Sequence, residues 1–443
     1  MKRLAEISPR AILVIGWLGL FLYAYPGFMS FDSVSQLMQA RSGVYLDNHP
    51  PAMAALWHCA ELVITGPVAL LIAQITAFLV GTYRLCATRM TRRRAAIAAS
   101  LVLWFPPVAN TVGVIWKDSQ MAAYLVLGTA LLLAPRLRTR IVGLAFISLA
   151  TAMRHNAFAM TLPLVVLLFY WHPLMRWWQR YAIATVAWVA VTLAAQTASG
   201  LLADHHVFMW HQSLALLDIV GTIRYAEPIS DAELERELTG TPLAFSDHLQ
   251  DHARAVLDPA ASPTDDLWNA TNTFFQRPAA PDEAQRNAIA AAWKKIVFDH
   301  PAAYLRYRLV VFGQLVQLDG TQLGTPIYCW FTDVQQPFES GERISHYAAP
   351  SHLQEIAREA MLWLGDTWLF HVGLYLIVSL LLLPLCWRDR ESFALVASGL
   401  AGEAGLFVIA PTVDVRYSFW LIVATVLAAV LIAAKRIRSR GSS

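Results

Sequence analysis

The chain has 443 residues and a formal net charge of +3; 57% of its residues are hydrophobic and only 15% are charged. Together with a mean hydropathy of +0.46, this composition is far from that of a soluble domain and indicates a membrane protein. The net charge is too small to indicate a nucleic-acid partner, and the basic residues lie in loops rather than on one face.

Ten apolar stretches run along the chain. Eight are long enough to cross a bilayer, which takes ~20 residues, and two are shorter. The expected spans are 11–30, 66–86, 95–115, 119–134, 141–155, 156–171, 181–202, 363–386, 393–412 and 417–434. The predicted fold class is therefore all-α, a polytopic membrane protein of about ten transmembrane helices (nine to twelve) with a mostly helical periplasmic portion.

The loops between these spans divide by charge. With the N-terminus in the cytoplasm, the inside loops (1–10, 84–94, 135–140, 172–180, 387–392 and 435–443) hold 19 Lys and Arg, whereas the short outside loops hold four. The positive-inside rule then predicts cytoplasmic N- and C-termini in the inner (plasma) membrane. Loop 31–51 and segment 203–362 are expected on the periplasmic side.

Three parts follow from this topology. Residues 1–202 form an N-terminal transmembrane module, 203–362 a mostly helical periplasmic segment, and 363–443 a C-terminal transmembrane module. Within the middle part, 302–318 is apolar but interrupted by two arginines. A crossing there would break the alternation of loops, so we expect an interfacial amphipathic helix, with a membrane crossing as the alternative.

Four short outward segments pair acids with bases at the ends of spans. They are Phe31-Asp32-Ser33, Trp116-Lys117-Asp118-Ser119, Met153-Arg154-His155-Asn156 and Val413-Asp414-Val415-Arg416-Tyr417. Ionisable groups at a membrane boundary are costly to desolvate, so several on one side predict a shared site.

Each of these residues also has a structural interpretation. Asp32 is either a catalytic carboxylate or, like Ser30, the N-cap of a short helix that begins near Val34. His49 is a metal ligand, a base or a packing residue. Lys117 is alternatively a snorkelling side chain, Arg154 and His155 a solvated turn, and Arg416 the structural partner of Asp414.

The order of these features resembles a known family. An aspartate just after the first span, a short helix, the step Asp47-Asn48-His49-Pro50-Pro51 into the next helix, and the late Asp414-Val415-Arg416-Tyr417 are similar to the glycosyltransferase C superfamily. The Trp116-Lys117-Asp118 and Arg154-His155-Asn156 segments resemble a bacterial branch of it. Members move a sugar from a polyprenyl-phosphate carrier to an acceptor on the outer side of the membrane.

The resemblance implies a polyprenyl-phosphate-linked sugar donor, a glycan, lipid or protein acceptor, and contact with membrane lipids, in cell-envelope glycan biosynthesis. Family members often carry Asp-Glu or Asp-Asp in the first loop, whereas here Ser33 follows Asp32. That departure favours a single carboxylate and no cofactor, with a divalent metal as the alternative.

The chemistry of such a transfer indicates a role for each candidate residue. Asp32 is the candidate base that takes the proton of the acceptor hydroxyl. Lys117, Arg154 and Arg416 are the candidate ligands of the donor phosphate, since fixed cations stabilise its developing charge. The supporting or acceptor-binding candidates are Asp47, His49, Asp118, His155, Asp414 and Tyr417. The expected reaction is a single displacement that inverts the anomeric centre.

Other residues are weaker candidates. Asp218 is an acid among apolar residues, and Trp116, Trp210, Trp268 and Tyr328 are candidates for stacking on sugar rings. His205, His206 and His211 match no zinc-binding spacing. The alternative function is a transporter or flippase of lipid-linked saccharides, but charges at one face and the lack of half-to-half similarity favour an enzyme. A non-catalytic assembly factor would make Asp32 dispensable.

Overall fold

The computed structural model describes residues 7–243, 248–256, 281–317, 350–410 and 413–440. Within these ranges all regular secondary structure is helical, and the two β-bridges, Phe28–Val114 and Leu46–His205, are isolated. The expected all-α class is thereby confirmed for the described part of the chain. Trp268, Tyr328 and the rest of 318–349 lie outside the described residues.

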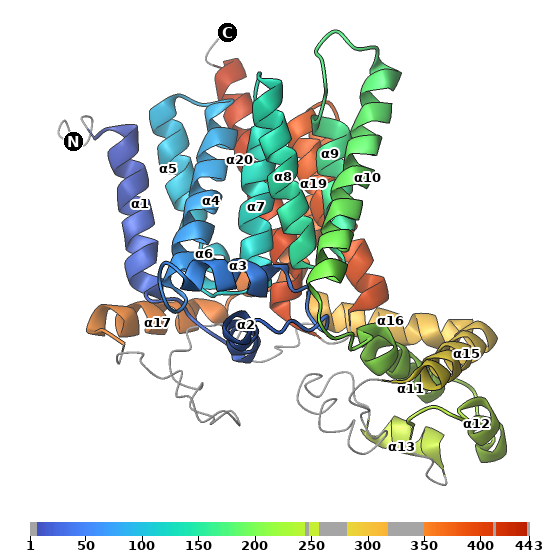
Figure 1. Ribbon diagram of the computed structural model, residues 1–443. Coiled ribbons are helices and arrows are strands. Elements are labelled where there is room, and N and C mark those ends of the chain that lie inside the picture. The colour runs from blue at the N-terminus through green and yellow to red at the C-terminus, as the bar shows by residue number, and fades with distance from the viewer. Residues whose placement is uncertain (1–6, 244–247, 257–280, 318–349, 411–412, 441–443) are drawn as a thin grey trace.

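A bundle of helices forms one half of the molecule (Figure 1). Its members are α1 (Pro9–Ala24), α4 (Val68–Ala87), α5 (Arg92–Leu103), α7 (Lys117–Leu132), α8 (Leu137–Met153), α9 (Ala157–Leu168), α10 (Trp177–Leu202), α18 (Val372–Cys386), α19 (Arg390–Ile409) and α20 (Phe419–Arg440). Helix α1 starts, and helix α20 ends, at the upper end of the bundle in this view.

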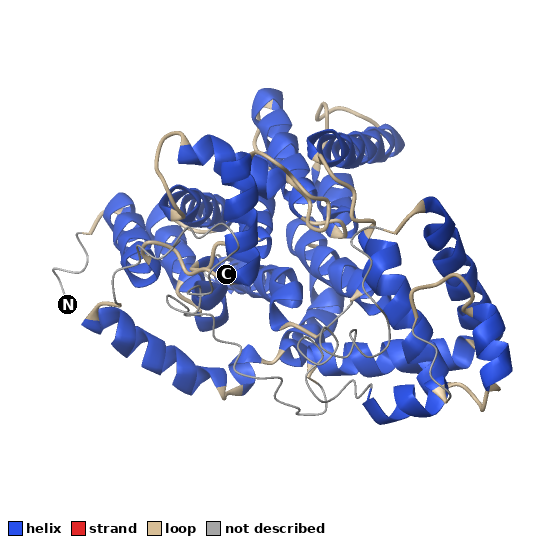
Figure 2. Cartoon of the chain, turned by 60° about the horizontal axis from the view of Figure 1, so that its bottom comes forward, coloured by secondary structure: helices blue, strands red, loops and turns tan. Residues whose placement is uncertain are grey.

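The remaining helices gather at the lower end, which we call the site end. They are α2 (Phe31–Ser42), α3 (Ala52–Glu61), α6 (Pro106–Val112), α11 (Ala215–Tyr225), α12 (Asp231–Glu237), α13 (Leu249–Val256), α15 (Glu283–Asp299), α16 (Pro301–Val316) and α17 (His352–Gly365). Short turns of other helix types span Trp210–Leu214, Trp368–Phe370 and Val415–Ser418. Figure 2 brings this end forward.

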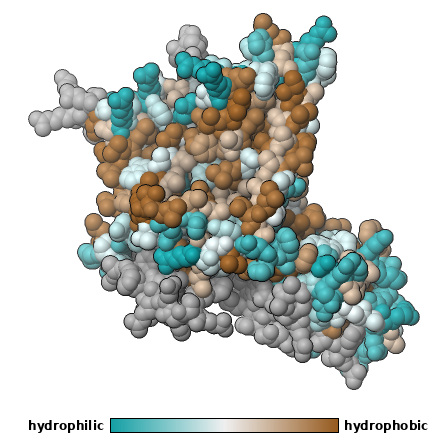
Figure 3. Space-filling view, viewed as in Figure 1, coloured by the Kyte–Doolittle hydropathy of each residue, from teal (hydrophilic) through white to brown (hydrophobic). Residues whose placement is uncertain are grey.

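The number of membrane spans is only partly supported. Helices form at all ten expected places, but within the described part of the chain four runs are long and apolar enough to cross a membrane: Val68–Ala87, Trp177–Leu202, Arg390–Ile409 and Val415–Ile437. The bent pair α5 and α6 is a fifth if the two helices form one span. Helices α1, α9 and α18 are apolar but shorter, so the count of about ten remains a prediction. On the face seen in Figure 3, hydrophobic residues predominate across the middle of the bundle and hydrophilic residues lie toward both ends.

Two expected spans differ in shape from the prediction. Stretch 95–115 is broken between α5 and α6 by a bend of 71°. The break falls at Phe105, because Pro106 and Pro107 disfavour a helical residue before them and fit the first turn of a new helix. Stretch 363–386 is divided as well, since 363–365 end α17 and α18 begins only at Val372.

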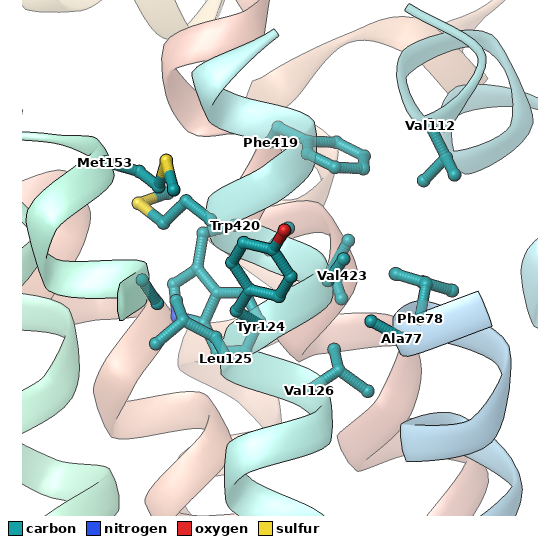
Figure 4. Packing of buried hydrophobic residues seen from close by; sticks show 14 of the residues in the cluster. Ala77, Phe78, Val112, Tyr124, Leu125, Val126, Met153, Phe419, Trp420 and Val423 are labelled. Carbon is teal, nitrogen blue, oxygen red and sulfur yellow. The ribbon is translucent and has the colours of Figure 1, made fainter. Parts of the chain in front are cut away.

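Helix α7 lies at the centre of the bundle and packs against α4, α8, α9 and α20. Figure 4 shows Tyr124 of α7 and Trp420 of α20 between Met153 of α8 and Phe78 of α4. The Trp420 Nε1–H donates to Ser398 Oγ at 2.8 Å, which satisfies the one polar atom of this buried ring. The first turn of α7 is therefore fixed at the site end by packing on several sides.

Helices α11, α15 and α16 pack on one another beside the bundle and share an apolar cluster. Helix α16 lies crosswise under the bundle in Figure 1. The sequence placed a helix here with an end at Asp299-His300-Pro301, and α15 does end at Asp299 while α16 begins at Pro301. Whether α16 contacts the membrane interface remains a prediction, because no membrane is part of the structure.

Candidate functional site

The first and last outward segments of the sequence meet at the site end. Helix α2 carries Asp32 in its first turn, and the turn Val415–Ser418 carries Arg416 just ahead of α20. Arg416 Nη1 lies 2.7 Å from Asp32 Oδ2, and Arg416 Nε lies 2.7 Å from Asp414 Oδ2. Two carboxylates from opposite ends of the chain thus hold one guanidinium.

The local sequence explains why the carboxylate of Asp32 is available for this contact. Ser30 is the N-cap of α2, and its backbone N–H donates to Ser33 Oγ at 3.0 Å. Asp32 is one residue past the start of the helix, so the hypothesis that Asp32 is the N-cap is wrong. A quarter of its side chain is exposed, which leaves room for another group to approach.

Lys117 and His49 complete a row of side chains with Asp32. Lys117 Nζ lies 2.5 Å from His49 Nδ1, and His49 Nε2 lies 3.8 Å from Asp32 Oδ1. Lys117 is the first residue of α7, and His49 precedes the two prolines that lead into α3. The row therefore joins the central helix of the bundle to the 31–51 loop.

The charges around this row set the protonation of Asp32 and His49. Burial alone would raise the pKa of Asp32, but Arg416, His49 and Lys117 together hold it well below its ordinary value. Burial and the neighbouring Lys117 lower the pKa of His49, and Asp32 offsets this only in part. At neutral pH the site thus presents an ionised carboxylate next to a neutral imidazole.

Aromatic rings lie against the cations of the site. The guanidinium of Arg416 lies 4.8 Å from the centre of the Trp116 ring, and that of Arg154 lies 4.7 Å from the Tyr417 ring. Trp116 Nε1 donates to Ser30 Oγ at 2.6 Å. Both rings hold a cation at a distance where the ring face attracts it. The predicted stacking of Trp116 on a sugar stays a prediction, and in the structure this ring packs under Arg416.

Arg154 is ion-paired with Asp118, whose side chain is almost fully buried. Arg154 is the C-cap of α8, and Asp118 is in the first turn of α7. The pair is therefore a fixed contact between two bundle helices at the site end, and Arg154 also reaches the cavity described next. The interpretation of Arg154 as part of a solvated turn does not fit this arrangement.

A cavity of about 220 Å³ lies beside the row. Its walls are the 47–51 loop, the junction of α8 and α9, and the last turns of α10, and they include Asp47, Pro50, Pro51, Thr151, Arg154, His155, Phe158, Ala195, Gln196, Ser199, Gly200, Ala203 and His206. Asp47 Oδ1 accepts from the backbone N–H of Val207 at 2.5 Å, and its Oδ2 lies 3.0 Å from His206 Nδ1. Burial and Lys117 lower the pKa of His155, which bonds to the Asp47 backbone.

All ten predicted site residues therefore lie at the site end. They form the row of Asp32, His49 and Lys117, lie next to it around Arg416, or lie around the adjacent cavity. Asp218 and Trp210 are elsewhere: Asp218 pairs with Arg308, and Trp210 packs against Trp293. Among the described residues, no group of three or more His, Cys, Asp or Glu side chains is arranged to hold a metal ion.

The sequence reasoning missed several polar side chains at this end. Gln196 and Ser199 of α10 line the cavity. Glu403 of α19 is buried and accepts from Ser418 Oγ at 3.0 Å, two residues after Arg416. A carboxyl inside the apolar stretch 393–412 was the signal for Glu403, whereas nothing in the sequence distinguished Gln196 and Ser199 from other polar positions.

Comparisons with known proteins give little further information. No family model and no curated protein matches the chain. Among solved structures, the chain is similar to the archaeal oligosaccharyltransferase AglB from Archaeoglobus fulgidus, in complex with an inhibitory peptide and a dolichol-phosphate, at 13% identity and a TM-score of 0.38. The match covers 96% of this chain and 50% of that one, so this chain spans about half its length. A similarity this low assigns neither a family nor an activity.

Proposed function

We propose that the chain is an integral-membrane glycosyltransferase that moves a sugar from a polyprenyl-phosphate carrier to an extracytoplasmic acceptor, which is a glycolipid, a lipid-linked glycan or a protein. One observation carries the proposal. An ionised, partly exposed Asp32 lies among Arg416, Lys117 and His49 at one end of an apolar helix bundle. A base next to fixed cations is what transfer from a lipid phosphate to a hydroxyl needs.

Asp32 would act as the base. As the acceptor oxygen bonds to the anomeric carbon, its proton passes to Asp32, and the bond from that carbon to the phosphate oxygen breaks. General base catalysis of this kind typically contributes ~10²–10⁴-fold. The cations that lower the pKa of Asp32 keep it ionised at neutral pH, so the carboxylate carries no proton of its own. A single displacement inverts the anomeric centre.

The cations would bind the leaving phosphate. Its charge grows as the sugar bond breaks, and preorganised cations in a site with little water stabilise that charge without reorganisation. Arg416 offers a planar guanidinium that can hold two phosphate oxygens, while Lys117 offers a point charge from the fixed start of α7. Arg154 and its partner Asp118 lie between this row and the cavity.

The cavity would hold part of the acceptor. None of Asp32, Lys117 and Arg416 lines it, so it suits a non-reacting portion of a substrate. The hydroxyls of Thr151 and Ser199, the amide of Gln196 and the imidazole of His155 offer hydrogen bonds, and Phe158 offers an apolar face. This mixture is typical of sites that fix a small polar ligand with a few placed groups.

The test is reconstitution in lipid nanodiscs with radiolabelled polyprenyl-phosphate sugars and candidate acceptors, with and without a chelator of divalent cations. We expect wild-type protein to transfer label and Asp32→Asn to lose at least about 100-fold of this activity, the lower bound for loss of a general base. Folding and donor binding should survive in the variant, since Asn is isosteric with Asp.

The matched control is Asp299→Asn, which removes a half-exposed carboxylate of α15 outside the site. It should retain wild-type transfer. Unchanged turnover in Asp32→Asn would overturn the assignment of the base. If wild-type protein carries lipid-linked saccharides across vesicles but transfers no sugar to any acceptor, the enzyme proposal fails and the transporter alternative stands.

A further inference from the structure

A second buried ion pair lies outside the site, between α11 and α16. Arg308 Nη2 contacts Asp218 Oδ1, and the two side chains are only 3% and 4% exposed. Trp293 of α15 donates its Nε1–H to Asp218 Oδ2 at 2.9 Å. The helices α11, α15 and α16, which we call the lateral unit, are thus joined at one carboxylate. A buried ion pair often adds little net stability, because removing the two charges from water costs free energy. Stabilisation alone therefore does not explain why this pair lies here.

Arg308 also contacts the end of helix α19 in the bundle. Its Nη1 donates to the backbone carbonyl of Ala410 at 2.9 Å. Ala410 is the C-cap of α19, where the last carbonyls lack partners within the helix and where a cation also complements the helix dipole. Ala410 precedes Asp414 by four residues and Arg416 by six. The arginine therefore fixes the end of α19, from which the chain continues to the Val415–Ser418 turn.

Apolar contacts also join the lateral unit to the chain around Asp414 and Arg416. Leu406, Ala410 and Val413 belong to the apolar cluster formed by α11, α15 and α16, and Tyr417 packs against it. Val413 and Tyr417 stand on either side of Asp414 and Arg416. The lateral unit thus contacts the chain before and after Asp414 and Arg416, and Arg416 is the residue that meets Asp32.

The lateral unit is itself rigidly joined at this point. At Gly221 of α11 the ring of Tyr307 of α16 approaches so closely that an added Cβ would lie 2.5 Å from it. Tyr307 is adjacent to Arg308, so the close approach of the two helices sets where the guanidinium lies. A contact this close transmits a displacement of α16 rather than absorbing it.

We propose that the Asp218–Arg308 pair is a positioning device, through which the lateral unit holds the Asp414–Arg416 turn so that Arg416 meets Asp32. Neither residue touches a substrate. The kinetic consequence rests on the proposed function, whereas the effect on the turn does not. Without the pair, the end of α19 loses its contact with Arg308, and Arg416 loses its fixed distance to Asp32.

The test variant combines Asp218→Asn with Arg308→Met. It removes the contact with Ala410 without leaving a buried charge unpaired, and the new amide oxygen can still accept from Trp293. The matched control is Arg140→Gln, since Arg140 is also buried and also donates to backbone carbonyls, those of Ala134, Pro135 and Trp171, outside the site.

Hydrogen–deuterium exchange of the full chain in nanodiscs is the primary readout. The backbone N–H of Arg416 donates to Asp414 Oδ1 and that of Tyr417 to Asp414 O, both at 3.0 Å. We expect at least about tenfold faster exchange of these two amides in the double variant and wild-type exchange in Arg140→Gln. Arg308→Lys should recover part of the protection, because an ammonium reaches one of the two partners.

The second readout is the pH profile of sugar transfer. If Arg416 moves away from Asp32, the pH below which activity falls should be higher in the double variant than in the wild type. It should be unchanged in Arg140→Gln. Loss of folded protein alone would lower the activity at every pH without shifting the profile. Wild-type exchange at Arg416 and Tyr417 in a folded double variant would overturn the positioning role, whether or not transfer has been observed; absence of transfer by wild-type protein would count against the proposed function alone.

Discussion

Both ends of the bundle hold an arginine between two carboxylates. At the site end Arg416 lies between Asp32 and Asp414, and at the opposite end Arg89 lies between Asp389 and Glu391. The side chains of the two arginines are equally exposed, at 13%. Composition and burial alone would therefore assign them the same purpose.

Their surroundings differ. Arg89 donates from Nε and both terminal nitrogens to Asp389 and Glu391 and reaches the Leu431 carbonyl as well, so the pair ties the end of α4 to the start of α19 and to α20. Exposure and charge do not separate the two ends, because Glu391 is 29% exposed and Lys435 lies 3.9 Å from Asp389. At the site end, however, His49 lies between Asp32 and Lys117, and a cavity adjoins. The neighbouring imidazole and cavity, rather than the ion pair itself, therefore single out the site end as the candidate for function.

The largest expected contrast is between Asp32→Asn and Asp389→Asn. The first should lower turnover per folded molecule by about 100-fold or more, because a base is lost. The second removes a partner of Arg89 and should lower the free energy of unfolding while leaving turnover per folded molecule within about threefold of wild type. Thermal unfolding and transfer are measured on the same nanodisc samples. Equal losses of turnover in both variants would abolish the distinction between the two ends.

The next contrast exchanges the arginines themselves. Arg416→Ala should weaken binding of a polyprenyl phosphate about tenfold to 100-fold, since charge-assisted bonds are worth about 1.5–3 kcal/mol each. Arg89→Ala should leave that affinity unchanged and cost about 3–5 kcal/mol of stability, because two carboxylates lose their buried partner. Binding is measured by native mass spectrometry with the lipid phosphate alone. If only the Arg89 variant loses affinity, the phosphate site lies at the other end.

A smaller effect concerns pH. Above its lowered pKa, Asp32 is ionised, so wild-type transfer should stay level through mildly acidic pH. In Arg416→Ala the largest of the attractions that lower this pKa is lost, and His49 and Lys117 remain against the effect of burial. The carboxylate therefore protonates at higher pH than in the wild type, and the fall in activity on the acidic side moves to higher pH. Arg89→Ala serves as the control and should keep the wild-type profile. An unshifted profile in Arg416→Ala would show that another group limits activity.

The convergence of the site could be predicted because span ends on the same side of a membrane must meet at one surface. Asp32, Lys117, Arg154 and Arg416 each end or begin an apolar stretch, and the alternation of loops placed all of them together. Which side chains pair could not be predicted. Arg416 pairs with its neighbour Asp414, as the sequence suggested, and also with Asp32, which only tertiary packing brings near.

Span lengths and the role of Asp218 were harder to infer, for physical reasons. The length of an apolar stretch does not determine where a helix ends, because helix ends are set by backbone chemistry. Helix α1 ends at Ala24 ahead of Pro26, and α5 ends before the two prolines at 106 and 107. An acid among apolar residues looks the same in a sequence whether it faces a substrate or a buried arginine. Asp218 faces Arg308, and that partner lies in a helix 90 residues further on.

The smallest expected effect tests the cavity. Gln196→Ala removes one amide from its wall, and one hydrogen bond to a neutral group contributes about 0.5–1.5 kcal/mol, so the KM for the acceptor should rise about twofold to tenfold while the KM for the donor stays unchanged. Gln179→Ala, on the first turn of the same helix and away from the cavity, is the control. If instead the donor KM rises, the cavity holds part of the donor, and the acceptor must approach Asp32 from another side.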